Sequence, residues 1–173
     1  IEKILAAIPN VRGGYFVFLG DGREKGRLRA MAAERGLEGR ARFVDAVPYA
    51  RLYLYTAQAD AGLQVLQNTC FNHYSAISNK LLEYVMAGLP VIASDFPEMR
   101  RIVEEEGIGI LVRPDDAEEI AAAANRLLCD RAFYDACRKN ALRARAKYNW
   151  ENEQKLYLEV YDKYKRDTKH GKR

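Results

Sequence analysis

Apolar positions along the chain follow two alternating patterns. Short continuous apolar runs bounded by glycine or polar residues are typical of buried strands, and apolar residues at helical spacing separate them. Five such runs predict strands, over 15–20, 41–45, 60–66, 89–94 and 107–112. Strands that alternate with helices build a parallel sheet with helices on both faces. The pattern therefore predicts an α/β domain with a Rossmann-like parallel sheet flanked by helices.

Capping residues place some helix ends. Gly88 stands where a left-handed cap would end a helix over 79–87. Asp95 and Glu98 have capping-box spacing at the start of the next helix. Between the third strand and the helix over 79–87 lies a polar segment that we expect to be a loop, and the chain after the fifth strand is expected to be helical.

Composition narrows the class of protein. The 173 residues, 49% of them hydrophobic, suffice for one domain, expected over 1–166, with a basic and disordered tail over 167–173. A net charge of +4 is too small to indicate nucleic-acid binding. There is no apolar run long enough for a membrane span and no secretory leader, so we expect a soluble, cytoplasmic protein. Three cysteines without a CxxC pair indicate neither a disulfide framework nor a zinc finger. Because Ile1 already belongs to a helical pattern, we expect a piece of a longer polypeptide.

The loops after the first two strands are candidate ligand sites, because ligands bind at the carboxyl ends of strands in open parallel sheets. Gly20 and Gly22 form a glycine turn between a strand and a helix, where a ligand can approach the backbone. The spacing differs from GxGxxG, and Asp21 puts a carboxylate where a pyrophosphate would lie, so a plain tight turn is the alternative. Asp45, at the end of the second strand, could imitate the ribose-binding acid of an NAD site.

A stronger candidate is the start of the helix over 79–87. Ser78 or Asn79 is expected to cap it and to leave backbone N–H groups free. Lys80 in the first turn opposes the helix dipole, which is better explained if an anion binds there; pairing with Glu83 is the alternative. Glu83 stands among apolar residues and needs a partner, for which two ribose hydroxyls are suited. The alternative is that the helix dipole and Lys80 together stabilise the Glu83 carboxylate without any ligand.

Together these segments carry a family resemblance. The chain contains NKLLEYVMAGLPVIASDFPE, FVFLGDG, ARFVDAVP, GIGILVRPDDAEEIAAAANRLL and YNWEN, in that spacing and over nearly its whole length. It resembles the C-terminal, donor-binding domain of GT-B glycosyltransferases of group 1 (family 4). The resemblance implies one half of a two-domain fold, with the acceptor-binding N-terminal half as its partner. A GT-B-like sugar-nucleotide epimerase, a non-catalytic nucleotide- or NAD-binding module and a structural or interaction protein remain alternatives.

The resemblance also implies roles for individual residues. Glu83 matches the second glutamate of the E-x7-E motif, which holds the donor ribose, and the donor diphosphate is expected at Ser78, Asn79 and Lys80. Ser75 takes the place of the first glutamate, which normally contacts the donor sugar, and His73 lies nearby. The loops around the base are expected to be formed by Gly20, Asp21, Gly22, Asp45, Ala46 and Val47.

The implied activity is retaining transfer of a hexose from a nucleoside-diphosphate sugar to a glycan or lipid-linked acceptor, without metal or cofactor. No catalytic residue is assigned within this chain, and the fragment alone is expected to be inactive. Peripheral contact with an anionic membrane is suggested by basic residues near the end of the chain, with a solvated helix face as the alternative. These residues are Lys155, Lys163, Lys165 and Arg166.

Overall fold

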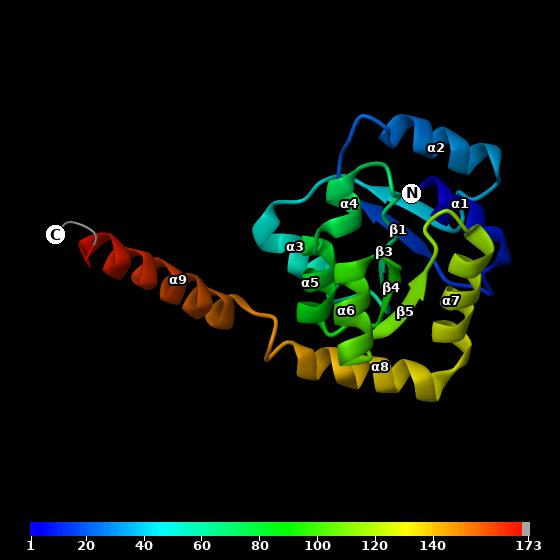
Figure 1. Ribbon diagram of the computed structural model, residues 1–173. Helices are drawn as coiled ribbons and strands as arrows, with labels where there is room; N and C mark the ends of the chain where they lie inside the picture. The colour runs from blue at the N-terminus through cyan, green and yellow to red at the C-terminus, as the bar shows by residue number, and fades with distance from the viewer. Residues whose placement is uncertain (171–173) are drawn as a thin grey trace.

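The computed structural model describes residues 1–170 and shows an α/β domain from which one long helix projects (Figure 1). All strand pairs are parallel, and they form a two-stranded sheet, β1-β2, and a three-stranded sheet, β3-β4-β5. The strands are β1 (Phe16–Leu19), β2 (Ala41–Val44), β3 (Gly62–Gln64), β4 (Val91–Ser94) and β5 (Gly109–Val112). The predicted alternation of strands and helices and the predicted fold class are confirmed.

Helices separate successive strands and cover both faces. They are α1 (Glu2–Ala7), continued by a 3-10 turn (Ile8–Asn10), α2 (Lys25–Glu34), α3 (Tyr49–Thr56), α4 (Phe71–Ser75), α5 (Asn79–Ala87), α6 (Pro97–Glu106), α7 (Ala117–Cys129), α8 (Arg131–Ala144) and α9 (Trp150–His170). On β4, Val91 and Ala93 pack against α5, α6 and α8, whereas Ile92 packs against α1 and α7. Both faces of this strand are therefore buried, as its unbroken apolar sequence predicts.

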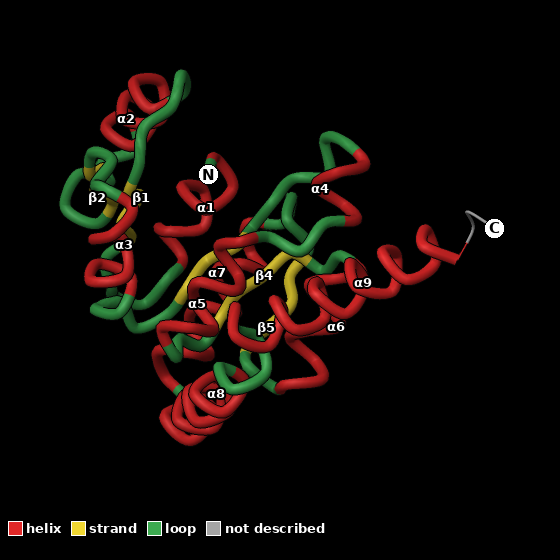
Figure 2. Tube along the Cα trace, turned by 90° about the vertical axis from the view of Figure 1, so that its left-hand side faces the viewer, coloured by secondary structure: helices red, strands yellow, loops and turns green. Residues whose placement is uncertain are grey.

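The parallel strands pair in two separate sheets, a division that the sequence pattern does not indicate. β1 pairs only with β2, and β3 only with β4, so within the described residues the facing edges of β1 and β3 carry no strand partner. Figure 2 shows β1 and β2 standing apart from β4 and β5. Packing nevertheless joins the two halves, since Phe16 contacts the apolar cores on both sides and α1 contributes Leu5 to one core and Ala7 to the other. Helix packing, and not backbone pairing, connects the halves.

Two local expectations fail and one is confirmed. α5 ends at Gly88 with φ 70°, the predicted left-handed cap. The capping box at Asp95 is wrong: Phe96 is the N-cap of α6, because the residue before Pro97 is held in extended backbone and cannot join the helix. Asp95 instead accepts a 2.6 Å hydrogen bond from Arg100 Nε. The polar segment before α5 is not entirely a loop, since it contains α4.

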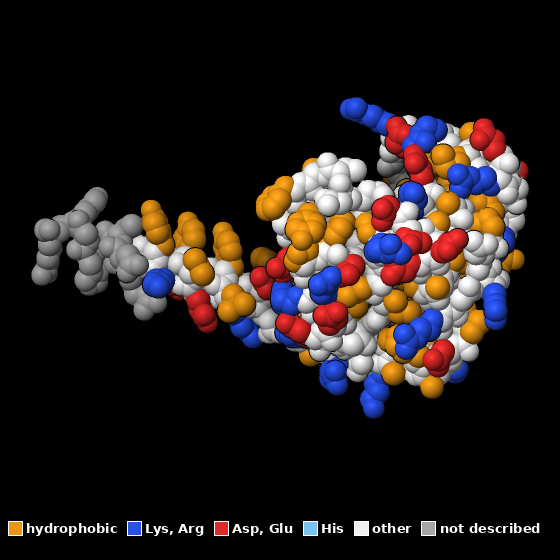
Figure 3. All heavy atoms as spheres, turned by 45° about the vertical axis from the view of Figure 1, so that its right-hand side comes forward, with side chains coloured by type: hydrophobic (Ala, Val, Ile, Leu, Met, Phe, Trp, Pro, Cys, Tyr) orange, Lys and Arg blue, Asp and Glu red, His pale blue; other side chains and the backbone are white. Residues whose placement is uncertain are grey.

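The C-terminal helix α9 leaves the body of the domain (Figure 1). Between residues 150 and 164 it carries a row of exposed apolar side chains (Figure 3). Its backbone is helical through His170, although the sequence places the start of a tail at 167; residues 171–173 lie outside the described residues. The most exposed apolar side chains of this row are Trp150, Tyr157, Val160 and Tyr164. Within residues 1–170, none of the helices combines the length and the apolar character that a membrane span requires.

Candidate functional site

The start of α5 has the geometry that the sequence predicts. Ser78 is the N-cap, with extended backbone, and its Oγ accepts a 3.3 Å hydrogen bond from the Lys80 amide. α5 leads into β4, which is parallel to β3, so the first turn of α5 lies at the carboxyl edge of the three-stranded sheet. The positive end of the helix dipole is therefore presented at the edge where α/β proteins bind ligands.

Lys80 and Glu83 do not satisfy each other. Within the described residues, neither side chain has a hydrogen bond or an ion pair, although Lys80 is exposed and Glu83 is half-buried. The alternative of an internal Lys80–Glu83 pair is therefore not realised. Burial, and secondly the negative charge of Glu83, raise the pKa of the neighbouring Tyr84. A partly desolvated carboxylate and a free ammonium thus stand one turn apart on α5. Beside them, the amides of Ser78 and Asn79 make no hydrogen bond within the described residues.

Close packing holds α5 in place. The ring of Tyr84 lies on the backbone of Gly62, where an added Cβ would meet Tyr84 Cγ at 2.2 Å. The Tyr84 hydroxyl donates to the Leu63 carbonyl at 3.5 Å. Gly62 pairs with Val91 in the sheet, so the absence of a side chain at position 62 fixes the distance between α5 and β3.

A lysine joins the loops that follow β1 and β2. Lys25 Nζ donates to Asp21 Oδ1 at 2.7 Å, to Asp45 Oδ1 at 2.6 Å and to the Val44 carbonyl at 3.2 Å. The second oxygen of Asp21 accepts from the Ala46 amide at 3.2 Å. Hydrogen bonds with Asp21, and next with Asp45, raise the pKa of Lys25, and the hydrogen bond from Lys25 lowers the pKa of Asp21.

Sequence reasoning missed Lys25. The spacing of Asp21 and Lys25 by four residues could have indicated half of this cluster. Asp45, the other half, is distant in the sequence and reaches Lys25 only because β1 and β2 are paired. The six residues predicted around the base do lie together in these two loops, and Gly20 donates its amide to the Val44 carbonyl at 3.1 Å.

The two residues predicted at the donor sugar lie on α4 and bond locally. His73 Nδ1 is 3.0 Å from Thr69 Oγ1 and 3.1 Å from the Gln67 carbonyl. Ser75 Oγ donates to the Phe71 carbonyl at 2.9 Å. Tyr74 packs its ring 5.5 Å from that of Phe96 and so holds α4 against the start of α6. The contact of His73 and Ser75 with a sugar stays a prediction.

The predicted residues therefore form two groups, one on each sheet. The base loops belong to the β1-β2 half, and the α4–α5 group belongs to the β3-β4-β5 half. Figure 1 shows α4 and the loop before α2 at the same end of the domain. Within the described residues, no hydrogen bond or ion pair links the two groups. There is also no group of three or more His, Cys, Asp or Glu suited to a metal in the part of the chain that the structure describes.

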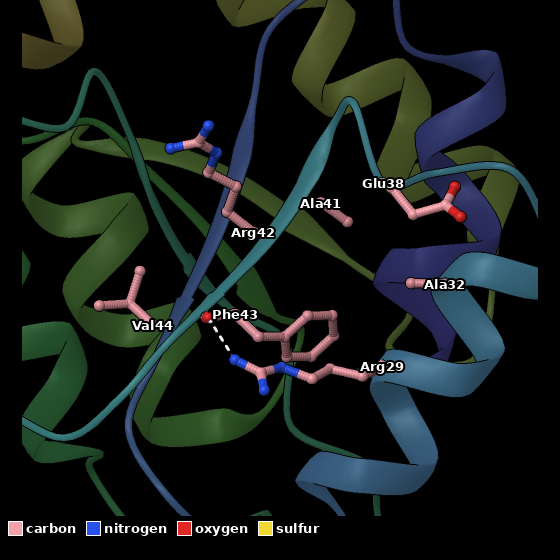
Figure 4. A pocket seen from close by; sticks show the side chains of 7 residues that line it. All are labelled: Arg29, Ala32, Glu38, Ala41, Arg42, Phe43 and Val44. Carbon is pink, nitrogen blue, oxygen red and sulfur yellow. Dashed lines mark hydrogen bonds between the residues drawn. The ribbon is translucent and has the colours of Figure 1, made fainter.

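A shallow pocket lies elsewhere, on the outer side of β2 (Figure 4). Its lining residues are Arg29, Ala32, Glu38, Ala41, Arg42, Phe43 and Val44. Arg29 Nη2 donates a hydrogen bond to the Phe43 carbonyl at 2.9 Å. This bond satisfies a backbone acceptor on the edge of β2 that does not pair with β1. Such coverage protects an edge strand from pairing with another chain. None of the predicted site residues lines this pocket.

Comparison with known proteins decides the family. A family model described as "Glycosyl transferases group 1" matches residues 1–130. The chain belongs to this family. An uncharacterized glycosyltransferase of Methanocaldococcus jannaschii is 26% identical over 165 residues, which cover 93% of this chain and 41% of that protein.

Solved structures give the same result. Sucrose-phosphate synthase of Thermosynechococcus elongatus superposes with a TM-score of 0.77 at 27% identity, over 93% of this chain and 42% of that one. Anabaena HepE in complex with UDP superposes with a TM-score of 0.74 at 19% identity, over 92% of this chain and 44% of that one. The chain thus spans less than half of each of these relatives. The predicted family and the predicted fold, one half of a GT-B glycosyltransferase, are confirmed, and glycosyl transfer is the general reaction of the relatives.

Proposed function

We propose that this chain is the donor-binding half of a retaining hexosyltransferase that uses a nucleoside-diphosphate sugar. The observation that carries the proposal is the unsatisfied pair at the start of α5: an exposed ammonium on Lys80 and a half-buried carboxylate on Glu83, with no partner for either in residues 1–165. A nucleoside diphosphate supplies both partners, an anionic diphosphate and a pair of ribose hydroxyls. UDP and its sugars are reasonable first ligands, since HepE has been crystallised with UDP.

In this proposal the donor lies along the carboxyl edge of the strands. Glu83 accepts hydrogen bonds from the ribose, the first-turn amides at Ser78 and Asn79 face the diphosphate, and Lys80 adds a positive charge. As the bond from the anomeric carbon to the diphosphate oxygen breaks, negative charge grows on the leaving diphosphate. Fixed dipoles and a nearby cation stabilise that charge more than they stabilise the intact donor, which is the requirement for catalysis.

The remaining parts of the donor are assigned to the neighbouring segments. The base lies against the loops 20–22 and 45–47, and the sugar lies near His73 and Ser75 on α4. His73 has its Nδ1 occupied by Thr69 and Gln67, which leaves Nε2 as the ring nitrogen available to a sugar hydroxyl. Glu83 serves as an anchor of the ribose in this arrangement and transfers no proton.

The acceptor, a glycan or a lipid-linked glycan, would bind to a second, N-terminal domain across the cleft. The exposed apolar row of α9 suits contact with that domain. The protein would act in the cytoplasm, at the membrane face if the acceptor is lipid-linked. Lys155 and Lys163 on α9 are accompanied by acidic residues such as Glu159, so the helix alone offers little net attraction to an anionic surface.

Calorimetric titration of the chain tests the proposal. The ligands are UDP, GDP, their sugar conjugates and NAD, and the variants are Lys80→Met and the exposed control Lys139→Met. We expect one nucleoside diphosphate to bind, Lys80→Met to weaken it about 10-fold, and the control to leave it unchanged. Binding of NAD alone, or equal affinity in Lys80→Met and the wild type, would contradict the proposal.

A further inference from the structure

We infer that Lys25 is a positioning residue that fixes the base-binding loops and so determines how tightly the base of the nucleotide is held. The inference rests on the proposed function, because it assigns the loops 20–22 and 45–47 to the base. The cluster itself is independent of that assignment. It consists of one ammonium on α2, two carboxylates on the two loops, and the backbone carbonyl of the last residue of β2.

Lys25 is used internally and is not available to a phosphate. Its three N–H donors match three acceptors, namely Asp21 Oδ1, Asp45 Oδ1 and the Val44 carbonyl. The side chain of Lys25 is only 15% exposed, whereas those of Asp21 and Asp45 are 61% and 84% exposed. The cation is therefore covered at the junction of the loops and the two carboxylates face outward. A phosphate would have to displace a carboxylate to reach the ammonium.

The cluster sets the direction of the backbone after β2. Asp21 is bound on both oxygens, by Lys25 on one side and by the Ala46 amide on the other. The Ala46 N–H is thereby committed within the protein. Among the backbone groups of this loop that make no hydrogen bond within the described residues are the Ala46 carbonyl and the Val47 amide, which offer an acceptor and a donor to the edge of a base. Lys25 holds these two groups where they are through Asp21 and Asp45.

Removal of the ammonium would reverse the local electrostatics. Asp21 and Asp45 both contact the same nitrogen, so without it two carboxylates would face each other across the loop junction. Like charges at this separation repel, and the loop after β2 would move away from the loop after β1. The apparent affinity of a ligand that requires the closed arrangement is the intrinsic affinity multiplied by the fraction of molecules that are closed, so this affinity would fall.

The test compares ligands with and without a base. Lys25→Met keeps most of the aliphatic stem and removes the charge, and Lys25→Arg keeps the charge. Lys139→Met, at an exposed position of α8, is the matched control. Affinities are measured for the nucleoside diphosphate that the wild type binds and for pyrophosphate, which lacks base and ribose. Amide hydrogen exchange at Ala46 and thermal unfolding are recorded for each variant.

We expect Lys25→Met to weaken the nucleoside diphosphate about 10-fold and pyrophosphate less than about 2-fold, with Lys25→Arg recovering part of the loss. Ala46 exchange should accelerate in Lys25→Met alone, with little change in the midpoint of unfolding. Equal loss for both ligands would indicate a merely structural role and overturn the inference, as would unchanged affinity with unchanged exchange. If the wild type binds pyrophosphate and no nucleotide, the proposed function fails together with the inference. If Lys25→Met binds the nucleotide with the affinity of the wild type, only the inference fails.

Discussion

Gly62 fixes the position of α5, and replacing it with alanine tests that contact directly. In the native structure the Cβ of an alanine at position 62 would lie 2.2, 2.3 and 2.7 Å from three atoms of the Tyr84 ring. Ordinary contacts begin near 3.4 Å, so the ring or the strand must move by about 1 Å. Because Cγ sits at the base of the ring, rotation of the ring cannot relieve the overlap.

The expected cost follows from the packing around this contact. Gly62 donates its amide to the Pro90 carbonyl at 2.9 Å and stands opposite Val91 in the sheet, so the strand has little freedom to retreat. Overpacking of a rigid site typically costs about 1–3 kcal/mol, and we expect Gly62→Ala near the upper end, about 2–3 kcal/mol. Nucleotide affinity should fall as well, because displacement of α5 moves Ser78, Lys80 and Glu83 together.

Urea unfolding followed by circular dichroism measures this change, with Gly39→Ala as the matched control. Gly39 lies in a turn, with nothing within 4 Å of an added Cβ and without the left-handed backbone that would strain alanine. The control should therefore be neutral or stabilise by up to about 1 kcal/mol. A free energy of unfolding for Gly62→Ala within about 0.5 kcal/mol of the wild type would refute the reasoning, since it would mean that Tyr84 does not rest on Gly62.

Two further predictions concern helices outside the candidate site. Asp116 caps α7 by accepting from the Glu118 and Glu119 amides at 3.0 Å, and Asp116→Ala should cost about 1 kcal/mol at neutral pH by chemical denaturation. The hydrogen bond from the Glu119 amide lowers the pKa of Asp116 from its usual 3.8. The stabilisation by the Asp116 carboxylate is therefore present above pH 3.8 and is lost as the pH falls through the lower pKa of the folded protein. Asp116→Asn should keep the cap without this pH dependence. Residues 150–165 of α9 bury no side chain, so deletion of 150–173 should change the free energy of unfolding by less than about 1 kcal/mol, measured by the same denaturation. A loss of several kcal/mol on deletion would show that α9 belongs to the core.

Local sequence signals predicted the elements that depend on local physics. α5 follows from apolar residues at helical spacing, from the Ser78 cap and from Gly88, and each acts within a few residues of its partner. The capping box at Asp95 failed although the decisive signal is also local, since Pro97 keeps Phe96 out of the helix and so makes Phe96 the N-cap.

Features that depend on distant pairing were not predictable in this way. The division of the sheet between β1 and β3 is a matter of which strand edges meet, and an apolar run carries no information about its neighbour. Lys25 was missed for the same reason, since Asp45 reaches it only through the pairing of β1 with β2. The candidate site was predicted best where its residues share one helix, at Ser78, Asn79, Lys80 and Glu83.

The central claim is that Glu83 binds the ribose of a nucleoside diphosphate. It is tested most directly by measuring the affinities of the wild type and of Glu83→Ala for a nucleotide with and without its ribose hydroxyls. Calorimetry compares the wild type with Glu83→Ala for UDP, or for GDP if that binds, and for the corresponding 2′,3′-dideoxy nucleotide; Glu34→Ala on the exposed end of α2 is the control. Loss of a hydrogen bond to a charged group costs about 1.5–3 kcal/mol, so Glu83→Ala should weaken the normal nucleotide by about 10- to 100-fold. The same substitution should leave the dideoxy nucleotide nearly unchanged, because its partner hydroxyls are missing. An equal loss for both ligands, or no loss for either, would contradict the account.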